Sequence, residues 1–389
     1  MSLPLNYAIR NITRRPMRTA LTILGIATVI FGCVLMLGIT RGIFLRLDVT
    51  GEDQNLLMIS RPGTNILFSS IEMEETVNLY EMPGLAMDSN GDPLVCPQVS
   101  HVSYIAVDDG GQTYRAPVTI RGISPNAWEV HSTVKLKEGS YPQGQFEVVA
   151  GSAAFVRLGL FGKTSPLGKV LNFEGTDWTV VGVFEAEGSL FESEIWMDVT
   201  DLQTAMRRRT YSFVVARFTS PQAAQAATSL FSTSGAIERY FKGWSEREYY
   251  REFGKSLAWV FWLALLMVAC VAGAGVLIGA NTMYTSVVNR MKELATVRVL
   301  GFKRRSILFS LELEGVLIAL LGGGLGLLAG LLLNQLPIVF SNGAFFIMVD
   351  WVVASIAIGL TLAIGLLGTL LPALEGLSIP VIVGLRKGK

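Results

Sequence analysis

The stretch NTMYTSVVNRMKELATVRVLGFKRRS, residues 281–306, is polar and basic, and it separates two long apolar runs. Residues 257–280 before it and 315–333 after it contain no charged side chain. Because about 20 apolar helical residues cross the hydrocarbon core of a bilayer, both runs are predicted to be transmembrane helices. The stretch itself, called the connector below, carries six bases and one acid, an excess that favours the cytoplasmic side of the membrane.

The connector also has the periodicity of a short helix. Val288, Met291 and Leu294 recur at a spacing of three on one face. Helices often end at a glycine, and Gly301 is placed to end this one. The pattern leaves two interpretations open. The connector is either a helix that docks into a cleft on a cytoplasmic partner, or an ordinary basic loop that anchors two membrane spans.

Residues 287–330, VVNRMKELATVRVLGFKRRSILFSLELEGVLIALLGGGLGLLAG, resemble the signature of MacB/FtsX-type ABC transporter permeases. In that family a basic residue and a Glu after the second span lead into an R-x-L-G segment, then to a Glu in the third span and a Gly-rich run. The resemblance implies that the connector contacts an ATP-binding subunit. The residues expected to make this contact are Arg290, Met291, Glu293, Leu294, Val297, Arg298, Leu300 and Gly301.

The third span, residues 307–333, contains two further features. Glu314 lies within it, and a carboxylate inside a membrane is costly, so we expect a structural polar contact there. Gly322, Gly326 and Gly330 are spaced by four, which predicts a smooth stripe for close helix packing. The spacing does not decide whether the packed helix belongs to the same subunit or to a second one.

Basic clusters predict the orientation of the chain. Residues 1–18 are predicted to form a cytoplasmic amphipathic helix, and the bases within it keep the amino terminus inside before the first span, 19–40. A cleaved signal peptide is the alternative, but the apolar run is longer than a signal sequence requires. A short outer loop, 334–350, precedes the fourth span, 351–371. The bases of the tail, 372–389, return the chain to the cytoplasm.

The composition is that of a mixed protein. Of 389 residues 51% are hydrophobic and 16% are charged, which is too apolar for a soluble protein and too polar for one that is membrane throughout. Residues 41–256 contain 26 acids and 19 bases, and most of the other bases flank the apolar runs, so nucleic-acid binding is not indicated. Only Cys96 lies in this polar region, which excludes a disulfide framework within it.

Residues 41–255 are predicted to form a large α+β extracytoplasmic domain. Short β-branched runs at 102–107, 117–123, 147–151, 178–186 and 212–218 predict strands, and helical patterns intervene at 152–160 and 201–208. The order EGSYPQGQFEVVAGSAAFVRLGLFG…PLGKVLNFEGTDWTVVGVFEAEG is similar to the outer domain of the MacB family. Residues 55–95 resemble nothing familiar, and we expect the recognition features peculiar to this chain there.

Catalytic sites are not indicated. Gly162-Lys163-Thr164 lacks the first Gly of a phosphate-binding loop, because Arg157 stands there, so the chain is expected to bind no cofactor and to leave ATP and Mg²⁺ to a separate ATPase. His101 and His131 lack the spacing of metal ligands, so no metal site is expected. Clustered acids such as Asp108 and Glu192, and the three arginines 207–209, are more often solvated surface groups than catalytic ones.

These features together predict a permease subunit with four transmembrane helices and a large α+β outer domain between the first and second, in the bacterial cytoplasmic membrane with both termini inside. By the resemblance, it converts ATP hydrolysis on a separate ABC ATPase into movement of the outer domain for export, without being an enzyme itself. The partners implied are that ATPase, a second permease copy, identical or paralogous, membrane lipid and a periplasmic adaptor. The alternative function is an FtsX-like signalling subunit that activates a periplasmic or cell-wall enzyme.

Overall fold

The computed structural model describes residues 16–378 apart from 110–111, 159–165, 230, 232–236 and 341–342. The described chain divides into two compact units. The membrane unit contains residues 16–42, 258–336 and 346–378, and the outer domain contains 43–257 and 337–345. The predicted amphipathic helix at 1–18 lies almost wholly outside the described residues, as does the tail beyond residue 378.

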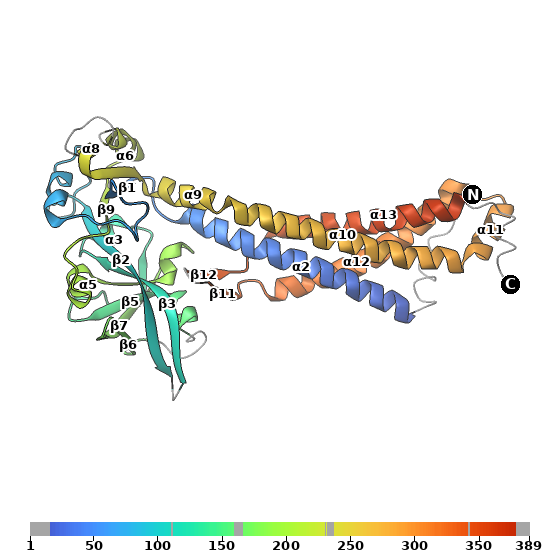
Figure 1. Cartoon of the computed structure of the whole chain (residues 1–389), viewed down its shortest axis with the longest axis horizontal. Coiled ribbons are helices and arrows are strands. Elements are labelled where there is room, and N and C mark those ends of the chain that lie inside the picture. The colour runs from blue at the N-terminus through green and yellow to red at the C-terminus, as the bar shows by residue number, and fades with distance from the viewer. Residues whose placement is uncertain are drawn as a thin grey trace. The chain divides into compact units, whose positions relative to one another are not determined.

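Four helices in the described chain are long and apolar enough to cross a membrane. The predicted fold class, four transmembrane helices with an α/β-type domain inserted between the first and second, is confirmed. Each helix extends beyond its predicted span at one end or both; α2 continues through Gly42, and no proline or glycine interrupts residues 281–289 after the apolar run of α10. Figure 1 shows them side by side as α2 (Pro16–Val49), α10 (Ala258–Asn289), α12 (Arg304–Leu332) and α13 (Trp351–Ser378).

Small residues allow the four helices to approach closely. A side chain on Gly279 of α10 would meet Gly368 of α13 at 3.5 Å, and one on Gly365 of α13 would meet Ala319 of α12 at 2.9 Å. Between α2 and α10, Thr22 Oγ1 donates to Thr282 Oγ1 over 3.2 Å. Such contacts are typical of membrane helices, where lipid is as apolar as the helix surface and close packing supplies the association energy.

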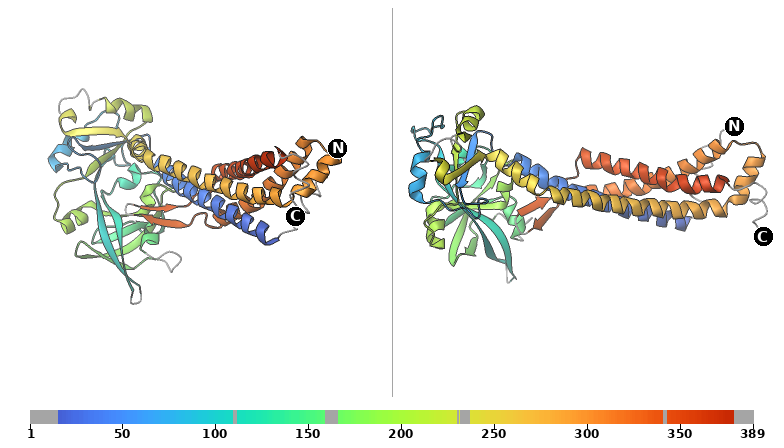
Figure 2. Two further views of the ribbon diagram at one scale, coloured as in Figure 1. Left: turned by 45° about the vertical axis from the view of Figure 1, so that its right-hand side comes forward. Right: turned by 45° about the horizontal axis from the view of Figure 1, so that its top comes forward.

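The outer domain is built on one mixed sheet, in the order β10-β1-β9-β2-β3-β8-β5-β7-β4, with β6 pairing β2 and β7. The long strand β2 joins its two parts, since its first residues pair with β9 and the rest pair with β3. Figure 2 shows β2 and β3 as a long two-stranded ribbon. The strands are β1 (Asn55–Ser60), β2 (Val95–Asp109), β3 (Gln112–Ile123), β4 (Lys135–Gly139), β5 (Glu147–Gly151), β6 (Val170–Phe173), β7 (Thr176–Glu185), β8 (Glu194–Asp198), β9 (Phe213–Arg217) and β10 (Phe241–Ser245).

Short helices cover the sheet, and Asp198 shows how the sequence starts one of them. Its carboxylate accepts from the backbone N–H of Thr200 at 2.8 Å, so the predicted helix at 201–208 begins earlier, at Val199. The predicted helix at 152–160 is the single turn α4 in the described residues. The helices are η1 (Met73–Leu79), α3 (Ala127–Val130), α4 (Ala154–Arg157), η2 (Leu190–Ser193), α5 (Val199–Met206), α6 (Pro221–Thr228), α8 (Ile237–Tyr240) and α9 (Glu246–Ser256).

Large aromatic side chains fill the core of the outer domain. Trp178 stacks on Phe173 with ring centroids 5.0 Å apart, and Trp196 packs on Phe184 at 5.0 Å and on Phe191 at 5.7 Å. All of them are almost fully buried. The predicted outer loop 334–350 contains two further strands, β11 (Pro337–Phe340) and β12 (Gly343–Phe346), which pair with each other.

Candidate functional site

The connector forms a separate short helix between α10 and α12. This helix, α11 (Met291–Val299), follows Arg290, whose φ of −113° breaks the line of α10. Gly301 has a φ of +92°, and the backbone N–H of Phe302 turns back to the carbonyl of Val297 over 3.3 Å. Since glycine adopts positive φ without the clash that a Cβ brings, Gly301 ends the helix as predicted.

The apolar face of α11 packs on the chain's own helices. Leu294 and Ala295 are only 6% and 5% exposed, and Val297 packs against the same cluster. Leu294, one of the residues expected to contact the ATPase, is thus buried by the chain's own helices. The cluster is formed with α10, α12 and α13 by Met283, Val287, Ile307, Leu311, Ala373 and Leu377.

Charged side chains fix the same helix to its neighbours. Arg290 Nη1 donates to the Glu314 carboxylate at 2.9 Å, and Arg290 Nε lies 3.7 Å from Glu293. Glu314 is 5% exposed, so the expected polar contact in the third span is an ion pair with the connector. Arg298 donates to the carbonyl of Leu377 at 3.3 Å. The connector is therefore locked to α12 by charge and to α13 by a hydrogen bond.

The rest of the surface of α11, with its C-cap Leu300, is exposed and partly apolar. Val299 and Leu300 are 66% and 69% exposed, and Lys292 and Thr296 are exposed beside them. Of the predicted contact residues, Glu293, Leu300 and Gly301 lie on the exposed side, whereas Arg290, Met291, Val297 and Arg298 are partly buried. Val299 was absent from the prediction. Its exposure could have been found only by knowing how the helix is rotated against its neighbours, since Val299 lies one turn after the buried Ala295.

The glycine stripe of α12 packs against α2 of the same chain. A side chain on Gly322 would lie 2.7 Å from the carbonyl oxygen of Ile23; Gly326 faces the carbonyl oxygen of Ala27 in the same way, and Gly330 faces the side chain of Val34. All three glycines are buried. The question that the spacing left open is answered: the partner helix is the first span.

A buried polar network in the outer domain was missed by the sequence analysis. Arg121, which is fully buried, makes a bidentate ion pair with Glu194, with nitrogen–oxygen distances of 2.6 and 2.7 Å. Burial alone would lower the pKa of Arg121, but the Glu194 carboxylate raises it overall, so the guanidinium stays charged. Arg121 Nη1 also donates to Gln98 Oε1 at 2.8 Å.

The orientation of the Gln98 amide decides which ring nitrogen of His131 carries the proton. Because Gln98 Oε1 accepts from Arg121, its amide nitrogen must donate to His131 Nε2 at 2.9 Å. The proton of the neutral imidazole is then on Nδ1, which faces Glu246 Oε1 at 3.5 Å. Burial, with the charges of Arg121 and Arg217, holds the pKa of His131 well below its usual value, so this ring is neutral.

Glu246 closes the network at the start of α9. It accepts from the Asn55 side chain at 2.9 Å and from the Glu52 backbone N–H at 3.2 Å. Burial raises the pKa of Glu246 to about 7, although the Asn55 hydrogen bond and the Arg121 charge act the other way. Tyr250, one turn further along α9, is buried beside Arg121. The network thus anchors α9, whose last residue lies two positions before α10, to strands β1, β2, β3 and β8.

The sequence carried little signal of this network. Arg121 and Glu194 sit 73 positions apart in strands that pair in parallel, and nothing local marks them as partners. Among the described residues, no group of three or more His, Cys, Asp or Glu side chains could hold a metal ion. The network fits an anchor between elements.

Two family models match the chain. The MacB-like periplasmic core domain matches residues 19–232, and the FtsX-like permease C-terminal domain matches residues 256–381. The chain is 22% identical to the uncharacterized ABC transporter permease YknZ of Bacillus subtilis over 98% of each chain. It is 25% identical to the macrolide export ATP-binding/permease protein MacB of Bordetella avium, over 88% of this chain and 53% of that protein. The chain thus spans about half the length of this MacB relative.

Among solved structures, the extracellular domain of YknZ is similar at 19% identity and a TM-score of 0.38, covering 49% of this chain and 99% of that one. The first model alone matches more than half of the sequence, and the second matches the region that contains α10, the connector and α12. The chain therefore belongs to the MacB/FtsX family of ABC transporter permeases.

Proposed function

We propose that this chain is the membrane subunit of an exporter, and that a separate cytoplasmic ABC ATPase drives movement of its outer domain through the connector. The observation that carries this proposal is the two-sided packing of α11. One face is locked into α10, α12 and α13, and the other presents exposed Val299 and Leu300 next to basic side chains. An apolar pair exposed on a short helix is what a partner's cleft would bury, at about 1.5–3 kcal/mol for each side chain.

The packing also supplies a route for the motion. Force on the exposed face of α11 reaches α12 through the ion pair of Arg290 with Glu314, and reaches α13 through the hydrogen bond of Arg298 to Leu377. Leu294, buried among three helices, prevents α11 from sliding alone. A closely packed cluster of this kind moves as a body, since packed interiors transmit strain instead of absorbing it.

The outer domain is continuous in sequence with α10 through α9. Glu246 and Tyr250 are buried in the domain, and they belong to α9, which precedes α10 in the sequence. Tilting of α10 would therefore act on the sheet through α9.

We propose that two permease copies, identical or paralogous, surround the pathway, because four helices are few for a translocation route. A periplasmic adaptor and the cytoplasmic orientation of both termini belong to the same proposal.

A second candidate function is FtsX-like signalling, in which the outer domain activates a periplasmic or cell-wall enzyme and moves no substrate. The match to the FtsX-like permease C-terminal domain over residues 256–381 supports this candidate. The same coupling contacts serve both functions, so the two differ only in what the outer domain acts on.

Reconstitution in liposomes with the cognate ATPase tests the proposal. Two spin labels, one on each side of the outer-domain sheet, would report ATP-dependent changes in distance. If the chain is an exporter, the rate of ATP turnover should rise with the concentration of its substrate. The substrate should also leave the vesicle surface. If ATP changes neither the label distance nor the turnover in the presence of the permease, the coupling proposal fails. If the distance changes without any substrate effect, the signalling function is favoured.

A further inference from the structure

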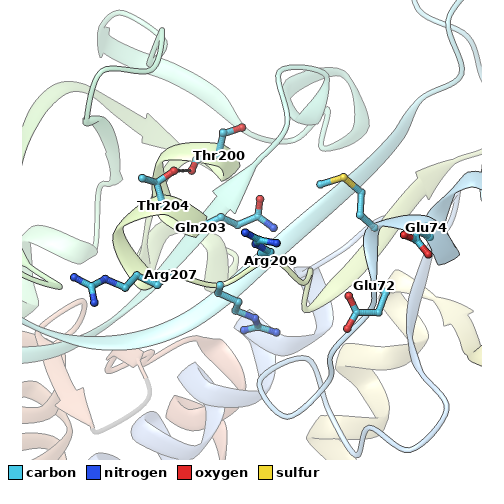
Figure 3. Close-up of a pocket in the computed structure, with 9 residues that line it drawn as sticks. Glu72, Glu74, Thr200, Gln203, Thr204, Arg207 and Arg209 are labelled. Carbon is cyan, nitrogen blue, oxygen red and sulfur yellow. Dashed lines mark hydrogen bonds between the residues drawn. The ribbon is translucent and has the colours of Figure 1, made fainter.

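A cleft of about 840 Å³ lies between α5 and η1 in the outer domain (Figure 3). One wall comes from α5 and the turn after it, with Gln203, Arg207 and Arg209. The other wall is the start of η1, with Glu72 and Glu74. The first wall belongs to the core of the domain, and the second lies within residues 55–95, the part of the chain that resembles nothing familiar.

Hydrogen bonds beside the cleft hold its two walls together. Ile71 and Tyr211 exchange backbone hydrogen bonds of 2.8 and 2.9 Å, and Ser70 Oγ donates to Thr210 Oγ1 at 2.8 Å. Arg208 Nη2 adds a hydrogen bond to the carbonyl of Ser69 at 3.1 Å. Because these bonds tie the two walls together, the cleft is formed before any ligand enters, as ligand sites usually are.

The arginine wall carries positive charge that no described carboxylate pairs with. Arg208 is used for structure, since its guanidinium also donates to the Tyr211 carbonyl. Arg207 and Arg209 are exposed, and neither has a side-chain hydrogen bond or ion pair to another described residue. Arg207 also has a φ of +52°, a left-handed backbone that disfavours residues with a side chain. In Figure 3, Arg209 and Gln203 lie between Arg207 and the acidic wall.

The acidic wall is oriented, and neither Glu72 nor Glu74 has an ion pair to another described residue. Glu72 is held by a capping box with Glu75, whose carboxylate accepts from the Glu72 backbone N–H at 3.1 Å. Glu74 is exposed and has no ion pair to any described residue. Opposite charges therefore face the same open space without meeting, and a ligand that carries both signs would satisfy them together.

We propose that this cleft binds a molecule that carries an oxyanion and an ammonium group, with the oxyanion at Arg209 and Arg207 and the ammonium at Glu74. Gln203 can donate a further hydrogen bond to the oxyanion. Two classes of molecule share this chemistry: short peptides with free termini, and lipid headgroups of the phosphoethanolamine type. The inference rests on the proposed function only in naming what the exporter would recognise, because binding itself requires no ATPase.

Equilibrium dialysis of the full chain in uncharged maltoside micelles tests the proposal. One arm contains a defined mixture of tripeptides with free termini, and the other contains glycerophosphoethanolamine, both quantified by mass spectrometry. We expect the wild type to retain one probe, and Arg209→Ser and Glu74→Gln each to weaken that binding at least tenfold. Lys135→Ser removes an exposed charge from β4 outside the cleft and should leave binding unchanged. Tripeptides with acetylated and amidated ends should not bind.

Two results would overturn the inference. One is that the wild type retains neither probe above the level of Arg209→Ser, and the other is that both cleft variants bind as the wild type does. Arg209 and Glu74 make no described side-chain contact, so both variants should keep the wild-type melting temperature. A negative result here leaves the ATPase coupling untouched, whereas a failure of coupling leaves this binding intact, so the two proposals fail separately.

Discussion

Replacing Gly326 with Leu should force α12 away from α2. A Cβ at this position would press on the Ala27 carbonyl oxygen and would lie 3.0 Å from the Phe31 backbone nitrogen and 3.1 Å from Ile30 Cβ. Two of these three neighbours are backbone atoms, which cannot rotate away as a side chain can. Overpacking of this kind costs about 1–3 kcal/mol, and the remaining three carbons of Leu place the cost at the upper end.

Gly324 provides the matched control on the same helix, since nothing lies within 4 Å of a Cβ built there. Gly326→Leu and Gly324→Leu add the same apolar volume and favour membrane insertion equally. Thermal unfolding in micelles should show a melting temperature lower by on the order of 5 °C for Gly326→Leu and little change for Gly324→Leu. Equal melting temperatures for the two variants would refute the packing of the stripe on α2.

Three further predictions follow from the outer domain and the topology. Arg121→Leu strands the buried Glu194 carboxylate and should destabilise the outer domain by about 3–5 kcal/mol in urea unfolding, whereas Arg251→Leu, which removes an exposed ion pair with Asp48, should cost less than about 1 kcal/mol. A similar loss in both variants would contradict the role of burial. Glu246 binds its proton more tightly when folded, with a pKa near 7 against an ordinary 4.5, so its own contribution to stability falls as pH rises from 5 to 7, whereas the buried neutral His131 acts in the opposite direction below its ordinary pKa of 6.5. The melting temperature of Glu246→Gln should therefore rise relative to that of the wild type as pH rises from 5 to 7, and a difference between the two proteins that does not change with pH would be inconsistent with this assignment. In a cysteine-free background, an impermeant thiol reagent applied outside should label Gly91→Cys and Gly144→Cys and miss Asn289→Cys, and labelling of the last would reverse the topology.

The membrane spans could be predicted because the bilayer acts on composition directly. An uncharged run of about 20 residues has few alternatives to a transmembrane helix, whereas the orientation, which the flanking bases predict, stays a prediction. The residues at which the helices end were harder to predict. α10 continues to Asn289, since residues 281–289 contain no helix breaker and their polar side chains are compatible with a helix outside the membrane.

The face of the connector helix could not be read from the sequence in the same way. Leu294 and Leu300 are the same residue type six positions apart, yet one is 6% exposed and the other 69%. Which of them turns inward depends on where α10 ends and how α11 is rotated against α12 and α13. The Arg121 network depends likewise on the pairing of β3 with β8, a contact between distant segments that no local pattern encodes. The three arginines at 207–209 were set aside as solvated, and only the folded chain brings them opposite Glu72 and Glu74.

The structure also changes which substitutions can probe the connector. Leu294→Asp would bury a charge among α10, α12 and α13, and Arg298→Glu would lose the bond to the Leu377 carbonyl, so either variant would damage the membrane unit itself. Val299 and Leu300 are suitable instead, because their side chains are mostly exposed. Val77 of η1, which is 62% exposed in the outer domain, is a control of the same residue type as Val299.

Association of the Val299→Glu, Leu300→Glu double variant with the co-expressed ATPase tests the central claim most directly. Affinity purification through a tag on the permease, followed by ATP turnover of the eluted complex, gives both binding and coupling. The account predicts that the double variant keeps the wild-type melting temperature, recovers at least tenfold less ATPase and loses coupled turnover, while Val77→Glu behaves as the wild type. Wild-type recovery of the ATPase by the double variant, with normal coupled turnover, would contradict the claim that the exposed face of α11 is where the ATPase acts.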